Sequence, residues 1–422
     1  MKLPMLFRFS AYGFLKNQQY YDPFLILIFR EKGLSFLAIG LLIGFRELCV
    51  NVMEVPSGAV ADLCGRRRSM VLSFAAYIVS FVLFGTSGSL GMLFVAMFCF
   101  AIGEAFRTGT HKAMILDWLR LEGREAEKTQ TYGFTRSWSK YGSAVSVVVA
   151  TALVFYRGSY GDVFFFCIIP YVFGIINFLG YPPELDGRPE HPPSVREMIR
   201  HLVSAFSQAI RQTRLRRVLV ESMGYEGTYK VVKDYLQPVV RQMAVALPVL
   251  VAVAPQRRTA LLVGCFYFVL YIVSGAASRR SHAFAGRWGG ESRAARVLWL
   301  ITLAVFVPIA VALWAGLFWL AAVGFVVLAL LQNLWRPITI ARVDNETDAT
   351  MGATMLSIES QAKAFGAMIL APLLGYAVDR LAGAPQEPAL WVVGAVGLVV
   401  ALAFALVPAM RPAAAERTAS LP

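Results

Sequence analysis

Ionisable side chains occur inside long apolar stretches of this sequence, where hydrocarbon makes an unpaired charge costly. Residues of this kind bind ions or polar solutes, relay protons, or neutralise one another. Lysine and arginine suit carboxylate and phosphate groups, whereas carboxylates and histidine can take up and release protons. The candidate substrate-binding residues are Lys16, Arg107, His111, Arg136, Lys140, Lys230, Lys233 and Lys363. The candidate proton-coupling residues are Asp22, Glu104, Glu226, Asp234 and Glu359.

The spacing of these residues places several of them on common helix faces. Glu104, Arg107 and His111 stand at i, i+3 and i+7, and therefore lie within about 60° of one another on a helix. Arg136 and Lys140 also share a face, with no acid in the same stretch. For any single pair of these residues, the alternative role is that the two charges neutralise each other between helices. We therefore infer a binding role from the whole set of charged residues.

The elements that carry these charges are predicted to be membrane spans. Hydrophobic residues make up 57% of the 422 residues and charged residues only 16%, and the mean hydropathy is +0.59. Soluble domains carry about 25% charged residues, so this composition indicates a polytopic membrane protein and excludes disordered, collagen-like and disulfide-rich secreted classes. A span needs about 20 apolar residues, and the chain offers twelve such stretches. They are 7–29, 35–61, 68–87, 91–118, 130–155, 162–181, 216–248, 259–278, 294–312, 315–340, 352–378 and 389–409.

The distribution of basic residues predicts the orientation of these spans. Lys and Arg outnumber Asp and Glu by 40 to 26, and most basic residues between the spans fall on the side of the N-terminus. Basic loops stay on the cytoplasmic side, so we expect a multi-pass protein of the cell inner (cytoplasmic) membrane with both termini cytoplasmic. The segments predicted to be cytoplasmic are the N-terminal tail, the loops around 62–68, 119–129, 182–215, 279–296 and 336–350, and the C-terminal tail.

The longest polar break divides the chain into two halves. We expect an N-terminal six-helix bundle over 1–181 and a C-terminal six-helix bundle over 216–410. The cytoplasmic linker 182–215 carries apolar residues at helical spacing from Ser194 onward, which predicts an amphipathic helix at the membrane surface. Residues 411–422 are expected to form a disordered cytoplasmic tail.

One loop motif stands between the second and third predicted spans. It reads Gly58-x-x-x-Asp62-x-x-Gly65-Arg66-Arg67. Gly58 permits close helix approach, Gly65 permits a tight turn, and Asp62 can accept hydrogen bonds from a helix N-terminus or an arginine. These properties predict a gating loop, with anchoring of the topology as the alternative role. A degraded copy, Gly275-x-x-x-Arg279-Arg280, follows the eighth span.

The motif and the layout together resemble the major facilitator superfamily. This resemblance implies an all-α membrane protein whose twelve transmembrane helices form two pseudo-symmetric six-helix bundles. It also implies that spans one, four, seven and ten line a central cavity, which spans two, five, eight and eleven flank. The charged residues would then surround one cavity with a modest surplus of cations, and the motif would close its cytoplasmic side in the outward-open state.

We therefore expect a secondary active transporter, a symporter or antiporter, that moves a small polar solute by alternating access. The cationic surplus favours an organic anion, and proton coupling is the expected drive, with sodium coupling and uniport as alternatives. A drug or toxic-metabolite exporter is the second candidate, although the fifth span lacks the Gly-Pro dipeptide found in many proton-linked exporters that the family contains. A membrane sensor or assembly protein on a carrier scaffold is the candidate from another class.

The sequence contains no motif that indicates an enzyme. It has no phosphate-binding P-loop, no His-Glu-x-x-His or Gly-x-Ser-x-Gly motif, and no clustered Cys and His, so we expect no catalytic residue, metal or cofactor. The 5 cysteines have no metal or redox spacing. The expected partners are the lipid bilayer, a small-molecule substrate and protons; we expect no nucleic acid and a monomeric protein.

Overall fold

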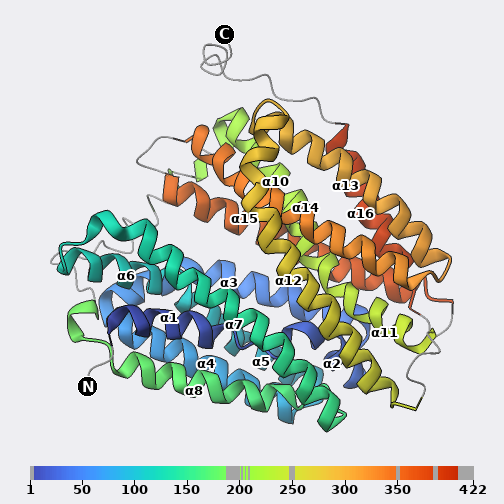
Figure 1. The fold of residues 1–422 in the computed structure, drawn as a ribbon, viewed down its shortest axis with the longest axis horizontal. Helices are drawn as coiled ribbons and strands as arrows, with labels where there is room; N and C mark the ends of the chain where they lie inside the picture. The colour runs from blue at the N-terminus through green and yellow to red at the C-terminus, as the bar shows by residue number, and fades with distance from the viewer. Residues whose placement is uncertain are drawn as a thin grey trace. The chain divides into compact units, whose positions relative to one another are not determined.

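The computed structural model describes residues 4–186, 200, 203–204, 206–207, 210–246, 252–347, 352–383 and 388–406. Within these ranges the regular structure is helical, without a strand (Figure 1). Most of the linker predicted to be an amphipathic helix lies outside the described residues, as does the tail 411–422. The side chain of Asp62 is also not among the side chains that the structure describes.

The chain divides into two compact units. Unit 1 comprises Met1–His201 with Ala244–Phe268, and unit 2 comprises Leu202–Met243 with Val269–Pro422. The domain boundaries at 181, 215 and 410 stay predictions.

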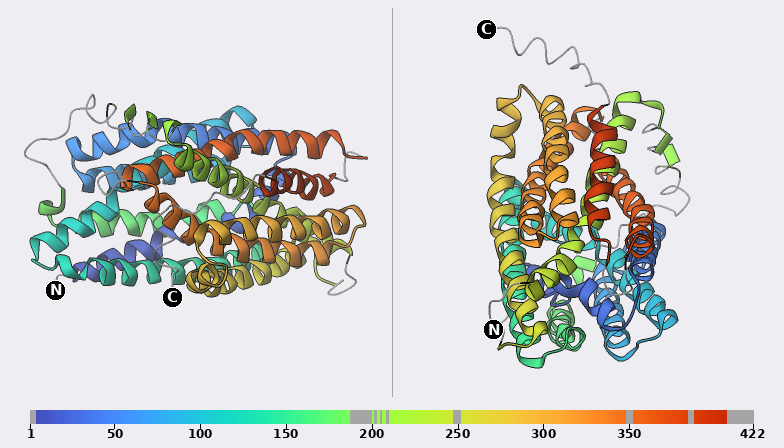
Figure 2. Two further views of the ribbon diagram at one scale, coloured as in Figure 1. Left: turned by 90° about the horizontal axis from the view of Figure 1, so that it is seen from above. Right: turned by 90° about the vertical axis from the view of Figure 1, so that its right-hand side faces the viewer.

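Unit 1 contains the eight helices of the N-terminal half. Their bounds are α1 Met5–Lys16, α2 Leu25–Glu31, α3 Phe36–Cys64, α4 Arg66–Thr86, α5 Leu90–Arg107, α6 Thr110–Leu121, α7 Lys128–Arg157 and α8 Val163–Leu179. Three short 3-10 turns accompany them: η1 Asp22–Phe24, η2 Glu125–Glu127 and η3 Pro183–Asp186. Within each unit the long helices run roughly parallel or antiparallel to one another (Figure 2).

Unit 2 contains most of the C-terminal helices. Their bounds are α10 Thr213–Val232, α11 Leu236–Ala246, α12 Pro255–Arg287, α13 Glu291–Trp314, α14 Phe318–Asn345, α15 Gly352–Arg380 and α16 Trp391–Ala405. The turn η4, Lys233–Tyr235, joins α10 to α11. The end of α11 and the first turns of α12 belong to unit 1, because their contacts lie there.

The helices match the twelve predicted spans. Among the described residues, 8 helices are long and apolar enough to cross a membrane, and Val163–Leu179 and Trp391–Ala405 are shorter apolar helices. The first and seventh spans are each built from two helices joined by a 3-10 turn. Pro23 interrupts the first span because its nitrogen carries no hydrogen for the helical ladder.

Two helices differ from their predicted spans in ways that concern the charged residues. The fourth span is broken, since Gly109 with φ of 81° separates α5 from α6. The predicted span 315–340 overlaps the predicted loop around 336–350, and in the structure α14 continues to Asn345. Arg336 therefore lies inside a helix. Pro337 lies inside this helix without ending it. The predicted loop around 279–296 is likewise mostly helical, because α12 runs to Arg287 and α13 begins at Glu291.

Glycines set the closest helix contacts. A Cβ on Gly142 of α7 would lie 2.6 Å from the carbonyl oxygen of Phe14 on α1. In unit 2, a Cβ on Gly394 of α16 would lie 2.5 Å from the Cα atom of Ala310 on α13. Small residues at such crossings allow backbones to approach within the membrane, where van der Waals packing drives helix association.

Candidate functional site

An ion pair on α5 forms the centre of the charged cluster in unit 1. Glu104 and Arg107 pair one helical turn apart, as their spacing predicts. The hydroxyl group of Tyr77 on α4 donates a hydrogen bond of 2.5 Å to Oε2 of Glu104, and Arg107 Nε donates to the same hydroxyl oxygen over 3.4 Å. Gly103 makes this possible, because a Cβ there would lie 2.7 Å from the Tyr77 ring. Tyr77 was not among the predicted site residues.

Three further cations belong to the same cluster. Lys16 of α1 interacts electrostatically with Glu104, Arg107 and Arg136, and its Nζ atom lies 5.5 Å from the centre of the Tyr12 ring. Arg136 and Lys140 are neighbours on α7, and both side chains are exposed. Among the described residues, none of these three cations forms an ion pair with a carboxylate. The cluster therefore carries a surplus of positive charge beyond the paired Arg107.

His111 lies in an aromatic pocket of unit 1. Its ring stacks on Tyr12 with 3.7 Å between centroids, and its Nε2 atom lies 3.3 Å from the Tyr181 hydroxyl oxygen. The ring is 7% exposed. The break at Gly109 separates His111 from the α5 helix that carries Glu104 and Arg107, so the predicted single helical face is not continuous. His111 nevertheless interacts electrostatically with Lys16 and Arg107.

A second charged cluster surrounds Glu359 on α15 in unit 2. Glu359 is fully buried and accepts hydrogen bonds from Ser222 of α10 and from Nη1 of Arg336, the latter over 2.6 Å. Lys363, one turn further along α15, places its Nζ atom 3.7 Å from the other carboxylate oxygen. Arg336 was not among the predicted site residues, although the predicted span 315–340 contains it.

Glu226 on α10 belongs to the same cluster but has fewer partners. It interacts electrostatically with Arg336, Lys363 and Glu359, and it accepts one hydrogen bond of 3.3 Å from the Gln332 side-chain amide. Its Oε1 atom is buried without a hydrogen-bond partner among the described residues. The two neighbouring carboxylates therefore differ in how firmly their charge is compensated.

The remaining predicted residues lie at the turns within the first and seventh spans. Lys230 occupies the last turn of α10 and interacts electrostatically with Lys363. In η4, the Nζ atom of Lys233 lies 3.1 Å from Oδ1 of the buried Asp234. Asp22 opens η1. These residues mark the positions where the helices of both spans are interrupted.

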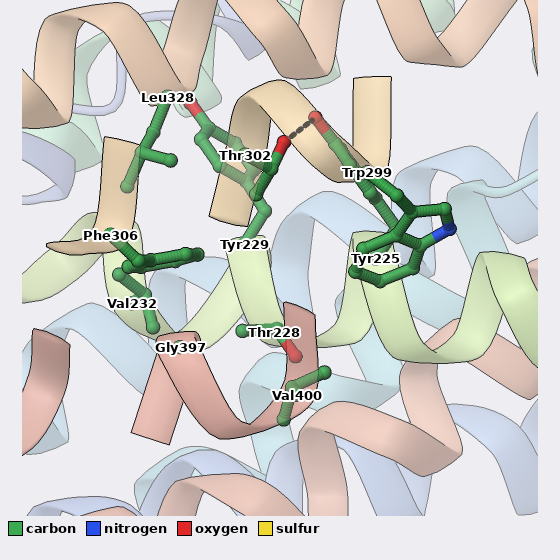
Figure 3. Close-up of a pocket in the computed structure, with 10 residues that line it drawn as sticks. All are labelled: Tyr225, Thr228, Tyr229, Val232, Trp299, Thr302, Phe306, Leu328, Gly397 and Val400. Atoms are coloured by element: carbon green, nitrogen blue, oxygen red, sulfur yellow. Dashed lines mark hydrogen bonds between the residues drawn. The ribbon is translucent and has the colours of Figure 1, made fainter. Parts of the chain in front are cut away.

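An aromatic pocket lies within unit 2, between α10, α13, α14 and α16 (Figure 3). Tyr225 stacks on Trp335 with ring centroids 4.0 Å apart, and its hydroxyl group lies 2.9 Å from the Thr302 hydroxyl oxygen, as the dashed line in Figure 3 shows. The residues that line the pocket are Tyr225, Thr228, Tyr229, Val232, Trp299, Thr302, Phe306, Leu328, Gly397 and Val400. None of these residues is charged, so the lining of this pocket differs chemically from the charged clusters.

The predicted gating loop connects α3 to α4 and is held inside unit 1. Gly65 adopts φ of 98°, which a residue with a side chain rarely adopts. Arg66 pairs with Asp117 of α6. The backbone nitrogen of Arg67 donates over 2.9 Å to Oδ1 of Asp186, which caps α4 from η3. Gly58 lies within α3, and a gating role for the loop stays a prediction.

Metal binding finds no support in the described part of the chain, where no group of three or more His, Cys, Asp or Glu side chains could hold a metal ion.

Comparison with known proteins relates most of the chain to membrane transporters. The model of the Major Facilitator Superfamily matches residues 9–358. The uncharacterized MFS-type transporter YxaM of Bacillus subtilis (strain 168) is 31% identical over 90 residues, which are 21% of this chain and 23% of that protein. The probable sulfoacetate transporter SauU of Cupriavidus necator is 27% identical over 128 residues, which are 30% of this chain and 29% of that protein. These matches span less than a third of the length of either relative.

Solved structures show the same fold over nearly the whole chain. A mutant of the nucleoside transporter NupG aligns with a TM-score of 0.79 at 12% identity, covering 95% of this chain and 98% of that chain. A POT family transporter in complex with a thioalcohol-conjugated peptide aligns with a TM-score of 0.70 at 14% identity, covering 95% of both chains. At these identities the likeness concerns the fold alone.

Proposed function

Because the chain belongs to the Major Facilitator Superfamily and is a multi-pass membrane transporter, we propose that it carries a small organic anion by alternating access, coupled to protons. The observation that carries the anion proposal is the surplus of cations around Lys16, where Arg136 interacts electrostatically with both Lys16 and Lys140. Lys16, Arg136 and Lys140 lie without ion-pair partners among the described residues. A surface with a surplus of positive charge raises the local concentration of anions.

A relative supports the same class of substrate. SauU is named as a probable sulfoacetate transporter, and sulfoacetate is a small anion with a carboxylate and a sulfonate group. Lysine and arginine are suited to both groups. Sulfoacetate is therefore the first compound to try, followed by other small carboxylates and sulfonates.

We assign the proton-coupling role to Glu226 and a structural role to Glu359. Glu359 forms ion pairs with Arg336 and Lys363, although its Oε2 atom, like Oε1 of Glu226, is buried without a hydrogen-bond partner among the described residues. Glu226 forms no ion pair among the described residues and accepts one hydrogen bond, from the Gln332 side-chain amide. A carboxyl group whose charge is less firmly compensated is the better candidate for reversible protonation during transport.

Transport into proteoliposomes tests this proposal directly. The purified protein would be reconstituted, and uptake of radiolabelled sulfoacetate would be measured with and without an imposed pH gradient. Lys16→Gln is expected to weaken the apparent affinity for the anion at least about tenfold, because a hydrogen bond to a charged group contributes about 1.5–3 kcal/mol. Lys128→Gln is the matched control, since this exposed lysine at the start of α7 lies outside the cluster.

Three outcomes would contradict the proposal. Unchanged anion affinity in Lys16→Gln would remove the role of the cation cluster. Uptake of lipophilic cations in place of anions would favour the drug-exporter alternative. An absence of transport across a panel of both compound classes, by a folded protein, would favour a sensor or assembly role.

A further inference from the structure

A groove on unit 1 combines an apolar lining with one cation at its end. It lies between α1, α7 and α8 and has a volume of about 510 Å³. The residues that line it are Phe7, Arg8, Ser10, Ala11, Phe14, Leu15, Trp138, Phe173, Ile176, Asn177 and Gly180. Phe173 and Ile176 are each 57% exposed, so the groove opens at the surface of unit 1. Arg8 is outside the set of residues assigned to substrate binding.

The guanidinium group of Arg8 is held in place at one end of this groove. Its Nη1 atom donates to the carbonyl oxygen of Asn177 over 3.2 Å, and the Asn177 side-chain amide donates back to the carbonyl oxygen of Arg8 over 2.9 Å. Gly180 leaves the necessary space, because a Cβ there would overlap with Arg8 Nη1. Among the described residues Arg8 forms no ion pair, so a fixed cation remains available to an anion.

The position of Arg8 fits the boundary of a membrane. Arg8 lies in the first turn of α1, and Gly180 is the C-cap of α8, so both helices have an end here. From Arg8 to Leu15 the α1 side of the groove runs for about 10 Å at 1.5 Å per residue. The groove therefore extends from a charged end at the helix termini into the apolar part of the span.

We propose that this groove binds an anionic phospholipid, with the phosphate group at Arg8 and an acyl chain along the aromatic lining. An apolar groove with a basic residue at the membrane boundary has the complementary chemistry for this ligand, which combines a negative headgroup with hydrocarbon chains. The proposal concerns a lipid site and does not depend on the transported substrate.

Trp138 provides a direct probe, because it lines the groove and packs edge-on against Phe14 with 6.4 Å between ring centroids. The full-length protein would be reconstituted in mixed vesicles of phosphatidylglycerol and phosphatidylcholine. In parallel samples of equal composition, either the phosphatidylglycerol or the phosphatidylcholine would carry brominated acyl chains, which quench tryptophan fluorescence. The chain has 8 tryptophans, so the signal of Trp138 would be isolated by comparison with Trp138→Phe.

Brominated phosphatidylglycerol is expected to quench Trp138 with an apparent affinity about fivefold higher than brominated phosphatidylcholine. This factor corresponds to about 1 kcal/mol per basic residue near an anionic surface. Arg8→Gln, and Gly180→Ala, which displaces the guanidinium group, are expected to bring the ratio close to one. Arg216→Gln should keep it, since this exposed arginine likewise donates to a backbone carbonyl, that of Ile210, but is not one of the residues that line the groove.

The same measurement can overturn the proposal. Equal quenching by both lipids would mean that unselected lipid fills the groove, and absence of Trp138 quenching would mean that no lipid enters it. Loss of the preference in Arg216→Gln to the same degree as in Arg8→Gln would assign it to general surface charge. Loss of the preference when inorganic phosphate is added would mean that Arg8 binds a soluble anion.

Discussion

At the scale of residues, the structure distinguishes carboxylates that the sequence leaves equivalent. Glu226 and Glu359 each stand four residues before a lysine, which predicts the same pairing for both. Glu359 is bound by Arg336 and by Ser222, whereas Glu226 is bound by one amide. The difference arises because Arg336, on another helix, reaches only one of the two acids at ion-pair distance.

Substitution of the two acids should therefore have different effects. Glu359→Gln removes the ion-pair partner of Arg336 and Lys363, and breaking a buried pair of this kind costs about 3–5 kcal/mol, so we expect a clear fall in the thermal midpoint in detergent. Glu226→Gln should change the midpoint little but abolish pH-gradient-driven accumulation, while substrate counterflow continues. Accumulation that persists in a well-folded Glu226→Gln protein would show that another group carries the proton.

At the scale of elements, glycines decide how closely the helices pack and where they break. Gly142 brings α7 against the backbone of α1, and the carbonyl oxygen of Gly142 accepts a hydrogen bond of 3.0 Å from the Gln18 side chain. Gly133 lies on the same helix with nothing near its would-be Cβ. These two positions look alike in sequence, but only one of them lies at a helix crossing.

Alanine substitution separates the two glycines. Gly142→Ala would place its methyl group against the Phe14 backbone, and such overpacking costs about 1–3 kcal/mol, so the thermal midpoint should fall. Gly133→Ala meets open space and should leave the midpoint unchanged or raise it slightly, since alanine is the better helix former. Equal effects at both positions would contradict the packing argument.

The gating loop gives a second prediction at this scale. Arg66 on α4 pairs with Asp117 on α6, so the pair joins two helices of unit 1. Arg66→Ala and Asp117→Asn should each slow transport turnover at saturating substrate while leaving affinity nearly unchanged, because neither residue belongs to the charged clusters. The double variant should be no slower than either single variant. Additive losses would show that the two residues act separately.

At the scale of the whole molecule, the twelve spans differ in whether one continuous helix or two helices build them. Among the described residues, 8 spans are long apolar helices, one of which is interrupted at Gly109, and two are the shorter helices α8 and α16. The first and seventh spans are pairs of helices joined by a 3-10 turn. An even number of spans places both termini on one side of the membrane. The basic loops favour the cytoplasmic side, because positively charged segments are retained there.

Reporter fusions test this orientation. Green fluorescent protein joined after Pro422 should fluoresce, and alkaline phosphatase at the same place should be inactive, because each reporter works on one side of the membrane only. Alkaline phosphatase inserted after Gly158, in the predicted outside loop between α7 and α8, should be active. Active alkaline phosphatase at the C-terminus would contradict cytoplasmic termini.

The sequence by itself determined the all-helical membrane architecture, because hydropathy and span length depend on composition along the chain. It also determined the pairing of Glu104 with Arg107, which depends on local helical spacing. The family follows from its match over residues 9–358. Only the tertiary structure decided the partners that come from distant helices. Tyr77 at Glu104, Arg336 at Glu359 and Asp186 at the start of α4 are contacts across 27, 23 and 119 residues, and side-chain reach between packed helices has no signature in a single sequence.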